Sequence, residues 1–473
     1  MKRTGLVLIS LIICCCTLAA QSIAGKLDAL VSSEKVLTTS EVGISVFNLT
    51  QGKQVYAYQD KKLYRPASIE KVITSVTALA ELREYYLFNT RIAYTGTIVQ
   101  DSILQGDLYL VGGFDPEFMD EDMNKLIEAV HNSGIRCIQG SLIADVSLTD
   151  SIYWGAGWSW DDTPEAFQPY LSPLMLNRGC VNVTVIPTSK GRKPKIEVIP
   201  ESDYYTVCNL AQSYAPQCGK LKVTRNWLDN GNTICVDGNA NYRCTKTLNM
   251  YSSKDFFLHT FAYRLKETGI SIQSVRYGIC PDEATGMYTF SRPLEPVLKR
   301  ALKKSDNLSA EAMFYHLAIS RSGKKNVGFK DAQEVIHSFM KHEIGRNPDN
   351  YSIVDGSGVS LYNYISPDLM MEYLKYAYAH PEIFHTFYEA LPVAGVDGTL
   401  HYRMKQGKAY RNVRAKTGTV TGISSLAGYV KAGNGDMLAF VIINQNVLRG
   451  KEARAFPVSY THLRAHETPE HLV

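Results

Sequence analysis

A β-rich stretch in the middle of the chain constrains the fold more than any other feature of the sequence. Between about residues 90 and 285, short strand-like runs such as GDLYLVGG and VNVTVIP are separated by Gly, Pro and Asn. The segments on either side have the apolar spacing of amphipathic helices. The sequence therefore predicts one α/β (α+β) unit that is split by a β-rich insertion.

Strand-like segments also stand near both ends of the chain. Residues 42–59 alternate in polarity around a Gln51-Gly52-Lys53 turn, as a β-hairpin does. Three more strand-like runs follow late in the sequence, namely VRAKTGTVTG, SSLAGYVKAG and DMLAFVIINQ. The helical segments include RPASIEKVITSVTALAEL and LEPVLKRALKKSDNLSAEAMFYHLAISRS. We expect the helices and the terminal strands to belong to the same α/β unit.

The first twenty residues have the pattern of a secretory signal. The segment MKRTGLVLISLIICCCTLAAQS has a basic start, an uncharged and largely apolar stretch, and small residues at Ala19 and Ala20. We therefore expect cleavage after Ala20 and export to the periplasm. No later run is long and apolar enough to span a bilayer, so at most a loose membrane association is expected. Cys14 to Cys16 leave lipoprotein anchoring open, although the residue before each of them is not small.

Charge and motif content exclude several classes of function. The formal net charge is only +4 and no long Lys/Arg run is present, so the sequence predicts no nucleic-acid partner. Neither a GxGxxG nor a GxxxxGK[ST] motif occurs, and no CxxC pair indicates zinc. We therefore expect neither a cofactor nor a metal ion.

Seven cysteines remain after the signal segment, and all of them lie in the β-rich stretch. Because an exported chain meets an oxidising environment, disulfides are more probable than metal ligation. We predict at least one disulfide among Cys208, Cys218, Cys235 and Cys244, which lie close together in the sequence. An odd number leaves at least one thiol outside any intramolecular disulfide. Nothing near the cysteines resembles the setting of a catalytic thiol.

Three short motifs occur in a fixed order along the chain. They are Ser68-x-x-Lys71, Ser305-Asp306-Asn307 and Lys416-Thr417-Gly418. Taken alone, each motif could have a purely structural role: a serine N-cap, a helix cap and a solvated strand end, respectively. The chain also contains three other serines that precede a lysine by three residues. Three motifs in order, each on a suitable element, favour chemistry over three coincidences.

These residue types suit nucleophilic catalysis. A serine hydroxyl is a poor nucleophile until a base removes its proton. Ser68 at a helix start lies beside the positive end of the helix dipole, and Lys71 lies one turn on, on the same face. Burial and a second nearby lysine would lower the pKa of Lys71 enough for it to act as that base. Ser305 can pass a proton to the leaving amine.

The remaining motif residues suit substrate binding. The amide of Asn307 can hold both Lys71 and an amide of the substrate. Lys416 and Thr417 suit a terminal carboxylate. The backbone of residues 417–419, through Gly418, can pair with an extended peptide as an added strand. The backbone N–H groups of Ser68 and Thr419 would form an oxyanion hole.

The order SxxK, SxN and KTG is that of the penicillin-recognising serine enzymes. From about residue 30 to 457, the chain resembles the penicillin-binding protein 4 family of D-alanyl-D-alanine carboxypeptidases/endopeptidases, the class C low-molecular-mass penicillin-binding proteins. The resemblance extends over GDLYLVGGFDPEF, KKSDNLSAEAMF, DGSGVSLYNYISP, LPVAGVDGTL and RAKTGTVTGISSLAGYV.

The resemblance implies a fold, a reaction and partners. The fold would be a β-lactamase/transpeptidase-like domain with a central antiparallel sheet flanked by helices. The enzyme would cleave peptidoglycan stem peptides and cross-links through an acyl-enzyme, and β-lactam antibiotics would inhibit it. In that family an aspartate of the second domain helps to bind the amino end of the peptide side chain, which points to Asp145 in LIADVSLTD.

The resemblance also implies a division of the chain. The spacing of 237 positions from Ser68 to Ser305 would accommodate two extra domains. The expected parts are a signal peptide at 1–20, two halves of the catalytic domain at 26–89 and 286–457, an insertion at 90–285, and a tail at 458–473. Within the insertion, residues 90–165 with 255–285 would form one domain and residues 166–254 the other.

The predictions also cover the last residues of the chain and two alternative functions. Residues 458–473 resemble a translated sequencing adapter that replaces the family's C-terminal helix, so we assign them no function. A serine β-lactamase is one rival, but no Glu-x-x-Leu-Asn motif occurs and the insertion is too long for that class. A non-catalytic β-lactam sensor or cell-wall binding module is the other, although no receptor-type transmembrane helix is present. The sequence does not define an oligomeric state.

Overall fold

The computed structural model describes residues 23–448, so the predicted signal peptide and the tail at 458–473 lie outside the described residues. The chain divides into two compact units. The first comprises residues up to Tyr64, Ser366–Tyr378 and the chain from Pro392, and the second comprises Arg65–Ile365 with Ala379–Leu391. The first unit thus combines segments from both ends of the sequence.

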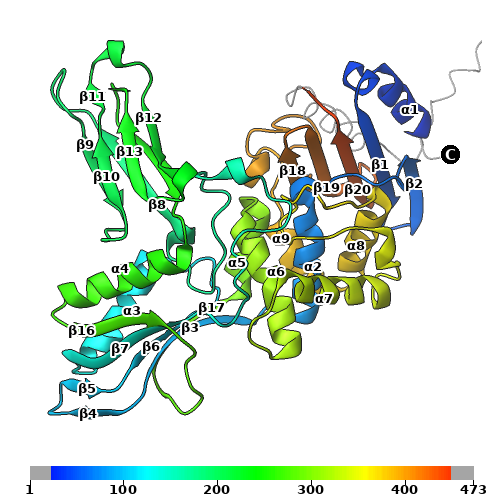
Figure 1. Cartoon of the computed structure of the whole chain (residues 1–473). Helices are drawn as coiled ribbons and strands as arrows, with labels where there is room; N and C mark the ends of the chain where they lie inside the picture. The colour runs from blue at the N-terminus through cyan, green and yellow to red at the C-terminus, as the bar shows by residue number, and fades with distance from the viewer. Residues whose placement is uncertain (1–22, 449–473) are drawn as a thin grey trace, which may run out of the picture. The chain divides into compact units, whose positions relative to one another are not determined.

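The first unit is built on a five-stranded antiparallel sheet (Figure 1). Its strands are β1 (Glu41–Asn48), β2 (Lys53–Tyr58), β18 (Arg414–Val420), β19 (Ile423–Lys431) and β20 (Met437–Gln445), in the order β18-β19-β20-β1-β2. The hairpin predicted at 42–59 is β1 and β2, and the three closing runs are the other strands. The register Ile44↔Ile442 joins the two ends of the sequence in the middle of the sheet.

Helices cover the sheet of the first unit. Helix α1 (Ile23–Ser33) places Leu27 and Val31 in one apolar core with Ile44 and Ile442 of the sheet. Helix α8 (Pro367–Ala379) lies against the opposite face, where the Tyr429 hydroxyl donates to the carbonyl of Leu374. The predicted α/β class with an antiparallel sheet flanked by helices is therefore confirmed.

The second unit holds a helical part. The sequence patterns that predicted helices on both sides of the insertion form α2, α5, α6, α7 and α9. Their bounds are α2 (Glu70–Glu81), α5 (Leu294–Lys303), α6 (Asn307–Ser322), α7 (Phe329–His342) and α9 (Pro381–Ala390). Buried apolar side chains such as Val72, Ile73 and Val76 line α2, as the three- and four-residue spacing predicts.

The second unit also holds a seven-stranded mixed sheet covered by α3 (Asp120–Asn132) and α4 (Ser253–Glu267) (Figure 1). Its strands are β3 (Leu87–Tyr94), β4 (Thr97–Val99), β5 (Ile103–Gln105), β6 (Leu108–Val111), β7 (Cys137–Asp145), β16 (Ser271–Tyr277) and β17 (Thr285–Pro293). Phe118, Phe257 and Phe290 meet in the core between this sheet and its helices.

Residues 180–249 form smaller sheets of short strands. The strands are β8 (Cys180–Ile186), β9 (Lys195–Ile199), β10 (Thr206–Asn209), β11 (Gln212–Ser213), β12 (Lys222–Arg225), β13 (Thr233–Asp237), β14 (Asn239–Ala240) and β15 (Cys244–Asn249). The buried guanidinium of Arg225 binds Thr163, Gly231 and Asn249 and so ties these strands to neighbouring loops.

The seven cysteines of the described chain carry free thiols, so the structure contains no disulfide among residues 23–448. Cys208 and Cys235 nevertheless lie directly opposite each other on the adjacent parallel strands β10 and β13. The predicted disulfide stays a prediction, and this pair is its best-placed candidate. Within the described range, no helix is long and apolar enough to cross a membrane.

Candidate active site

Ser68 lies in a single 3-10 turn, Ala67–Ile69, that leads directly into α2. The expected helix starts here, but Ser68 caps neither the turn nor α2, since neither helix start has a side-chain capping bond. The purely structural explanation of Ser68 as a helix N-cap is therefore wrong. The side chain of Ser68 is 8% exposed, so its hydroxyl lies in a largely desolvated setting.

Lys71 lies one turn after Ser68 and is completely buried. Its Nζ donates to Ser68 Oγ at 3.0 Å, to Asn307 Oδ1 at 2.8 Å and to the carbonyl oxygen of Ser357 at 2.7 Å. All three partners are neutral, and no carboxylate accepts directly from this nitrogen in the hydrogen bonds of the described residues. The amine is thus held in one position without being fixed there by an opposite charge.

Asn307 is the first residue of α6, and the carboxylate of Asp306 caps this helix by accepting from Ser309 N at 2.8 Å. Because the cap fixes the helix start, the Asn307 amide oxygen faces Lys71. Its Nδ2 donates to the carbonyl of Phe167 at 2.9 Å and to Gln168 Oε1 at 3.3 Å. Both amide N–H groups have acceptors, so a substrate amide would have to replace one of them.

The segment 355–358, with sequence DGSG, supplies the third partner of Lys71. Thr74 of α2 donates to the carbonyl of Gly356 at 2.7 Å, which fixes the peptide next to Ser357. Gly358 has φ +81°, and a Cβ there would lie 2.0 Å from the carbonyl oxygen of Ala67. Only glycine allows the segment to approach the turn of Ser68 so closely.

The pKa of Lys71 is lowered from its ordinary value to about 8 because burial disfavours the ammonium form. The carboxylates of Asp355, Glu311, Asp306 and Glu70 oppose this effect. A lysine with this pKa is a neutral amine in an appreciable fraction of molecules near neutral pH. It can therefore accept the proton of the Ser68 hydroxyl.

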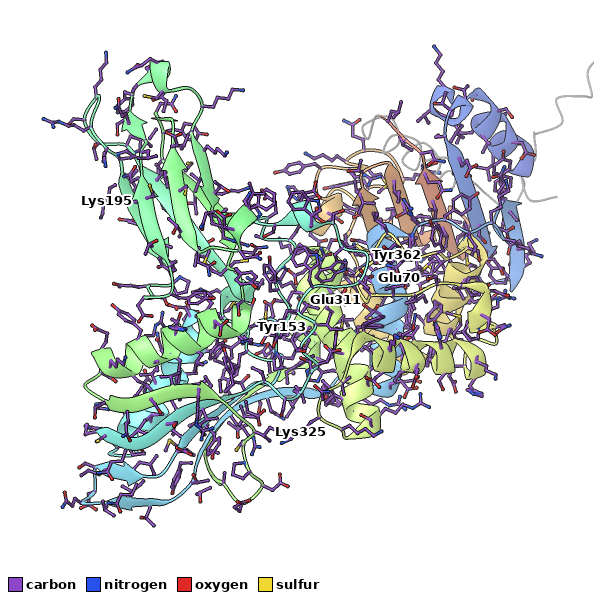
Figure 2. The ribbon with its side chains drawn as sticks, viewed as in Figure 1. Glu70, Tyr153, Lys195, Glu311, Lys325 and Tyr362 are labelled. Atoms are coloured by element: carbon purple, nitrogen blue, oxygen red, sulfur yellow. The ribbon has the colours of Figure 1, made fainter. Side chains whose placement is uncertain are left out.

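Two buried glutamates accompany Lys71 in this unit. Figure 2 labels Glu70 at the start of α2 and Glu311 on α6, two helices that pack against each other. Burial, together with the nearby charge of Asp355, raises the pKa of Glu70 well above its ordinary value and that of Glu311 to about 8. Both carboxyl groups are therefore biased towards the protonated form at neutral pH.

The other predicted residues of this unit lie as follows. Ser305 is half-buried in the connection between α5 and α6, two residues before Asn307, with φ +58°. Asp145 ends β7 and is 3% exposed. Its two carboxylate oxygens accept hydrogen bonds from Ser147 N and Cys280 N, so Asp145 stabilises the backbone at these two positions. Its binding of substrate stays a prediction.

The Lys-Thr-Gly motif belongs to the first unit, on β18. This strand is at the edge of the sheet, paired with β19, and Lys416 is completely buried. Lys416 Nζ donates to the carbonyl of Thr417 at 2.6 Å, and Thr417 Oγ1 donates to Thr399 Oγ1 at 2.8 Å. Thr419 is exposed at the far end of the motif, after the buried Gly418. In the described residues, no strand pairs with 416–420 on the side away from β19.

Sequence reasoning missed several groups that contact the Ser68–Lys71 pair or its partners. They are Ser357 through its carbonyl, Thr74, Glu70, Glu311, Asp355, Phe167 and Gln168. One signal was available for Glu311, which stands four residues after Asn307 and hence on the same face of its helix. Over residues 23–448, no cluster of three or more His, Cys, Asp or Glu residues could hold a metal ion.

The chain is similar to known proteins over most of its length. The model of the D-Ala-D-Ala carboxypeptidase 3 (S13) family matches residues 23–461. The chain is 28% identical to D-alanyl-D-alanine carboxypeptidase DacB of Haemophilus influenzae over 429 residues, which is 86% of each chain. It is also 28% identical to the D-alanyl-D-alanine carboxypeptidase of Actinomadura sp. strain R39, with 85% of this chain and 77% of that protein covered.

The fold of the chain is also similar to that of proteins with solved structures. The crystal structure of penicillin binding protein 4 (dacB) from Haemophilus influenzae matches with a TM-score of 0.81 and 25% identity, over 92% of this chain and 97% of that chain. The same protein complexed with a novel β-lactam matches with a TM-score of 0.77 and 24% identity, over 93% of this chain and 99% of that one. The predicted resemblance to penicillin-binding protein 4 is therefore confirmed.

A buried lysine hydrogen-bonded to a serine one turn earlier is typical of serine hydrolases that use lysine as the base. The matched family is of this class, a family of serine peptidases. The chain belongs to the D-Ala-D-Ala carboxypeptidase 3 (S13) family. It is accordingly a serine-type D-Ala-D-Ala carboxypeptidase, as the order of the three motifs predicted.

Proposed function

We propose that this protein is exported to the periplasm and removes the terminal D-Ala from peptidoglycan stem peptides, with Ser68 as the nucleophile and Lys71 as its base. The observation that carries the proposal is the buried Lys71 amine at 3.0 Å from Ser68 Oγ, with neutral acceptors on its other sides. β-Lactams, one of which binds the Haemophilus protein, would acylate the same serine.

The reaction has two halves. Lys71 takes the Ser68 proton as Oγ attacks the carbonyl of the penultimate D-Ala, and the resulting ammonium keeps its bonds to Asn307 and Ser357. Collapse of the tetrahedral intermediate breaks the C–N bond, and the proton passes through Ser305 to the leaving amine of D-Ala. Water then attacks the acyl-enzyme as Lys71 takes one of its protons, and Lys71 gives that proton to Ser68 Oγ when the ester bond breaks, which restores the Ser68 hydroxyl.

We propose binding roles for the remaining motif residues. Asn307 would bind an amide of the stem peptide after one of its present acceptors is displaced. Lys416 and Thr417 would bind the terminal carboxylate, and the backbone from Thr417 through Gly418 to Thr419 would pair with the extended peptide. The edge position of β18 supports this last role, because among the described residues no strand pairs with residues 417–420 on the side away from β19. Asp145 would help to bind the amino end of the side chain of the stem peptide.

We further propose that the two groups of sheets between residues 90 and 285 are the two inserted domains, at 90–165 with 255–285 and at 166–254. They would interrupt a catalytic domain made of residues 26–89 and 286–457. Peptidoglycan would be the partner, with at most loose membrane association.

The test is incubation with two muropeptides and analysis of the products by mass spectrometry. A monomer with a D-Ala-D-Ala end should lose one D-Ala, and a cross-linked dimer would be split if endopeptidase activity accompanies it. Labelled penicillin should attach to a peptide containing Ser68, and Ser68→Ala should remove both label and product. Rapid hydrolysis of penicillin without peptide cleavage would favour a β-lactamase, and stable labelling without cleavage would favour a sensor.

A further inference from the structure

Several acidic side chains lie near Lys71. Four carboxyl groups influence the charge on its nitrogen: Asp355, Glu311, Asp306 and Glu70. Asp306 lies partly exposed, and its Oδ2 accepts from Arg300 Nε at 3.3 Å, so its charge is balanced locally. The other three are at most 3% exposed and lie near a single lysine. Three buried anions beside one cation would be a costly arrangement.

Among the buried carboxyl groups near Lys71, Asp355 has the hydrogen-bond donors that an ionised carboxylate requires. Its Oδ1 accepts from Gly358 N at 2.8 Å and Asn363 Nδ2 at 2.7 Å. Its Oδ2 accepts from Trp158 Nε1 at 2.9 Å, Ser360 N at 2.7 Å and Ser357 Oγ at 3.3 Å. Five donors replace the water that an ionised carboxylate needs. The negative charge of the cluster therefore belongs on Asp355.

Glu70 has no such donors, and Glu311 has fewer than Asp355. Neither carboxyl oxygen of Glu70 has a hydrogen-bond partner among the described residues, although the side chain is completely buried. Glu311 Oε2 accepts from Gly356 N at 3.2 Å, while its Oε1 has no partner among those residues. The phenol of Tyr315, the next ionisable neighbour on α6, is itself buried. A buried carboxyl group without donors is far more stable protonated than ionised.

We propose that Glu70 and Glu311 are neutral carboxylic acids in the resting enzyme, and that Glu311 is a positioning residue that holds the 355–358 segment against Lys71. The inference rests on the proposed roles of Ser68 and Lys71 and deepens them. The directions of the pKa shifts of both glutamates agree with it.

The protonation state matters because it sets the charge on Lys71. Ionised Glu70 and Glu311 would stabilise the ammonium form, which has no lone pair for the Ser68 proton. With both glutamates neutral, a deprotonated amine would keep its two N–H groups on Asn307 Oδ1 and Ser357 O and would turn its lone pair to the Ser68 hydroxyl, which then becomes the donor at the same 3.0 Å. The three neighbours therefore fit the neutral amine as well as the ammonium, which donates to all three. Proton transfer would then leave one ammonium facing one carboxylate, that of Asp355.

The positioning role follows from a short run of hydrogen bonds. Gly356 N donates to Glu311, the Gly356 carbonyl accepts from Thr74, and the next carbonyl, that of Ser357, accepts from Lys71. A Cβ on Gly356 would lie 2.8 Å from the carbonyl oxygen of Ala310, so the segment lies directly on α6. The carbonyl oxygen of a protonated Glu311 can still accept from Gly356 N, although less strongly than a carboxylate oxygen would. Neutrality and positioning are therefore compatible.

The experiment compares Glu311→Gln with Glu311→Ala, and Glu70→Gln with the exposed control Glu128→Gln on α3. The rate of Ser68 acylation by labelled penicillin is measured from well below to well above pH 8, where Lys71 titrates. We expect Glu311→Gln and Glu70→Gln to keep the midpoint of this profile, with plateau rates within about threefold of wild type. Glu311→Ala should be slower by about tenfold, the effect of one lost hydrogen bond of about 1.4 kcal/mol.

The alternative makes an opposite prediction. If either glutamate were ionised, its glutamine variant would remove an anion beside Lys71, lower the pKa of that lysine, and move the midpoint to lower pH by about one unit or more. Such a shift, or equal rates for Glu311→Gln and Glu311→Ala, overturns the inference. An infrared difference spectrum gives an independent check, because the carbonyl band of a protonated carboxyl group should disappear in the glutamine variants. Absence of Ser68 labelling in the wild-type protein would instead refute the proposed function.

Discussion

The stability of the fold should rise when Glu311 is replaced by glutamine, and the gain should depend on pH. Glu311 is 2% exposed, and burial raises its pKa from an ordinary 4.5 to about 8. The folded state therefore keeps a proton that the unfolded state releases above pH 4.5. A raised pKa in the folded state contributes stability that is complete below pH 4.5 and is lost as the pH rises towards 8.

The magnitude follows from the linkage of protonation to folding. Each pH unit within this window costs about 1.4 kcal/mol, so wild type should lose about 3 kcal/mol between pH 5 and pH 8 through Glu311 alone. Glutamine cannot ionise and keeps an acceptor for Gly356 N. The difference in free energy of unfolding between Glu311→Gln and wild type should therefore grow by about 3 kcal/mol over this range.

The assay is urea unfolding followed by far-ultraviolet circular dichroism at pH 5 and pH 8. Glu128→Gln, the same exchange on an exposed helical position, controls for the change in net charge. A difference between Glu311→Gln and wild type that is the same at both pH values would refute the reasoning, because it would show that folding does not raise the pKa of Glu311.

Four further outcomes are expected. Lys71→Ala should lose nearly all penicillin acylation, at least about a thousandfold, because Lys71 Nζ is the one side-chain hydrogen-bond partner of Ser68 Oγ among the described residues; labelling kinetics measure this. Lys416→Ala should mainly raise KM for substrates with a free carboxylate, and steady-state kinetics with and without that carboxylate check it. His316, whose pKa burial lowers to about 4, should make stability fall as the pH drops from 6.5 to 4, and His316→Gln should flatten that part of the acid-unfolding curve. Non-reduced peptide mapping of protein exported to the periplasm should find Cys208 joined to Cys235, and the bond should stabilise the fold by about 3 kcal/mol.

The elements of the fold were predictable where a regular period marks them. The alternation in residues 42–59 became β1 and β2, and the three closing strand-like runs became β18, β19 and β20, in which β19 and β20 are buried on both faces over most of their length. The pairing of β1 with β20 was not predictable from period alone. It joins residues nearly 400 positions apart, and only the resemblance to a known family implied a common sheet.

The candidate site was predictable only where side-chain identity carries the chemistry. Ser68, Lys71 and Asn307 were found by their motifs, and the structure brings these three together. The Ser357 carbonyl was missed because any residue can supply a backbone acceptor. Glu70 was missed for a different reason: an acidic residue in the first turn of a helix ordinarily faces solvent and favours the helix dipole. Its burial depends on α6 and the 355–358 segment, which local sequence does not describe.

The backbone around the nucleophile shows why such a site depends on the whole fold. Ala67, directly before Ser68, has φ +49°, and Ser305 has φ +58°. Each conformation costs a residue with a side chain roughly 1–2 kcal/mol, and neither alanine nor serine reveals it in a sequence. The carbonyl of Ala67 approaches Gly358 so closely that a Cβ there would lie 2.0 Å away. The strained turn of Ser68 and the segment that holds Lys71 therefore restrain each other. A β-carbon at position 358 would have to displace one of them, and so would disturb the contact between Lys71 and Ser68 without altering any side chain that takes part in it.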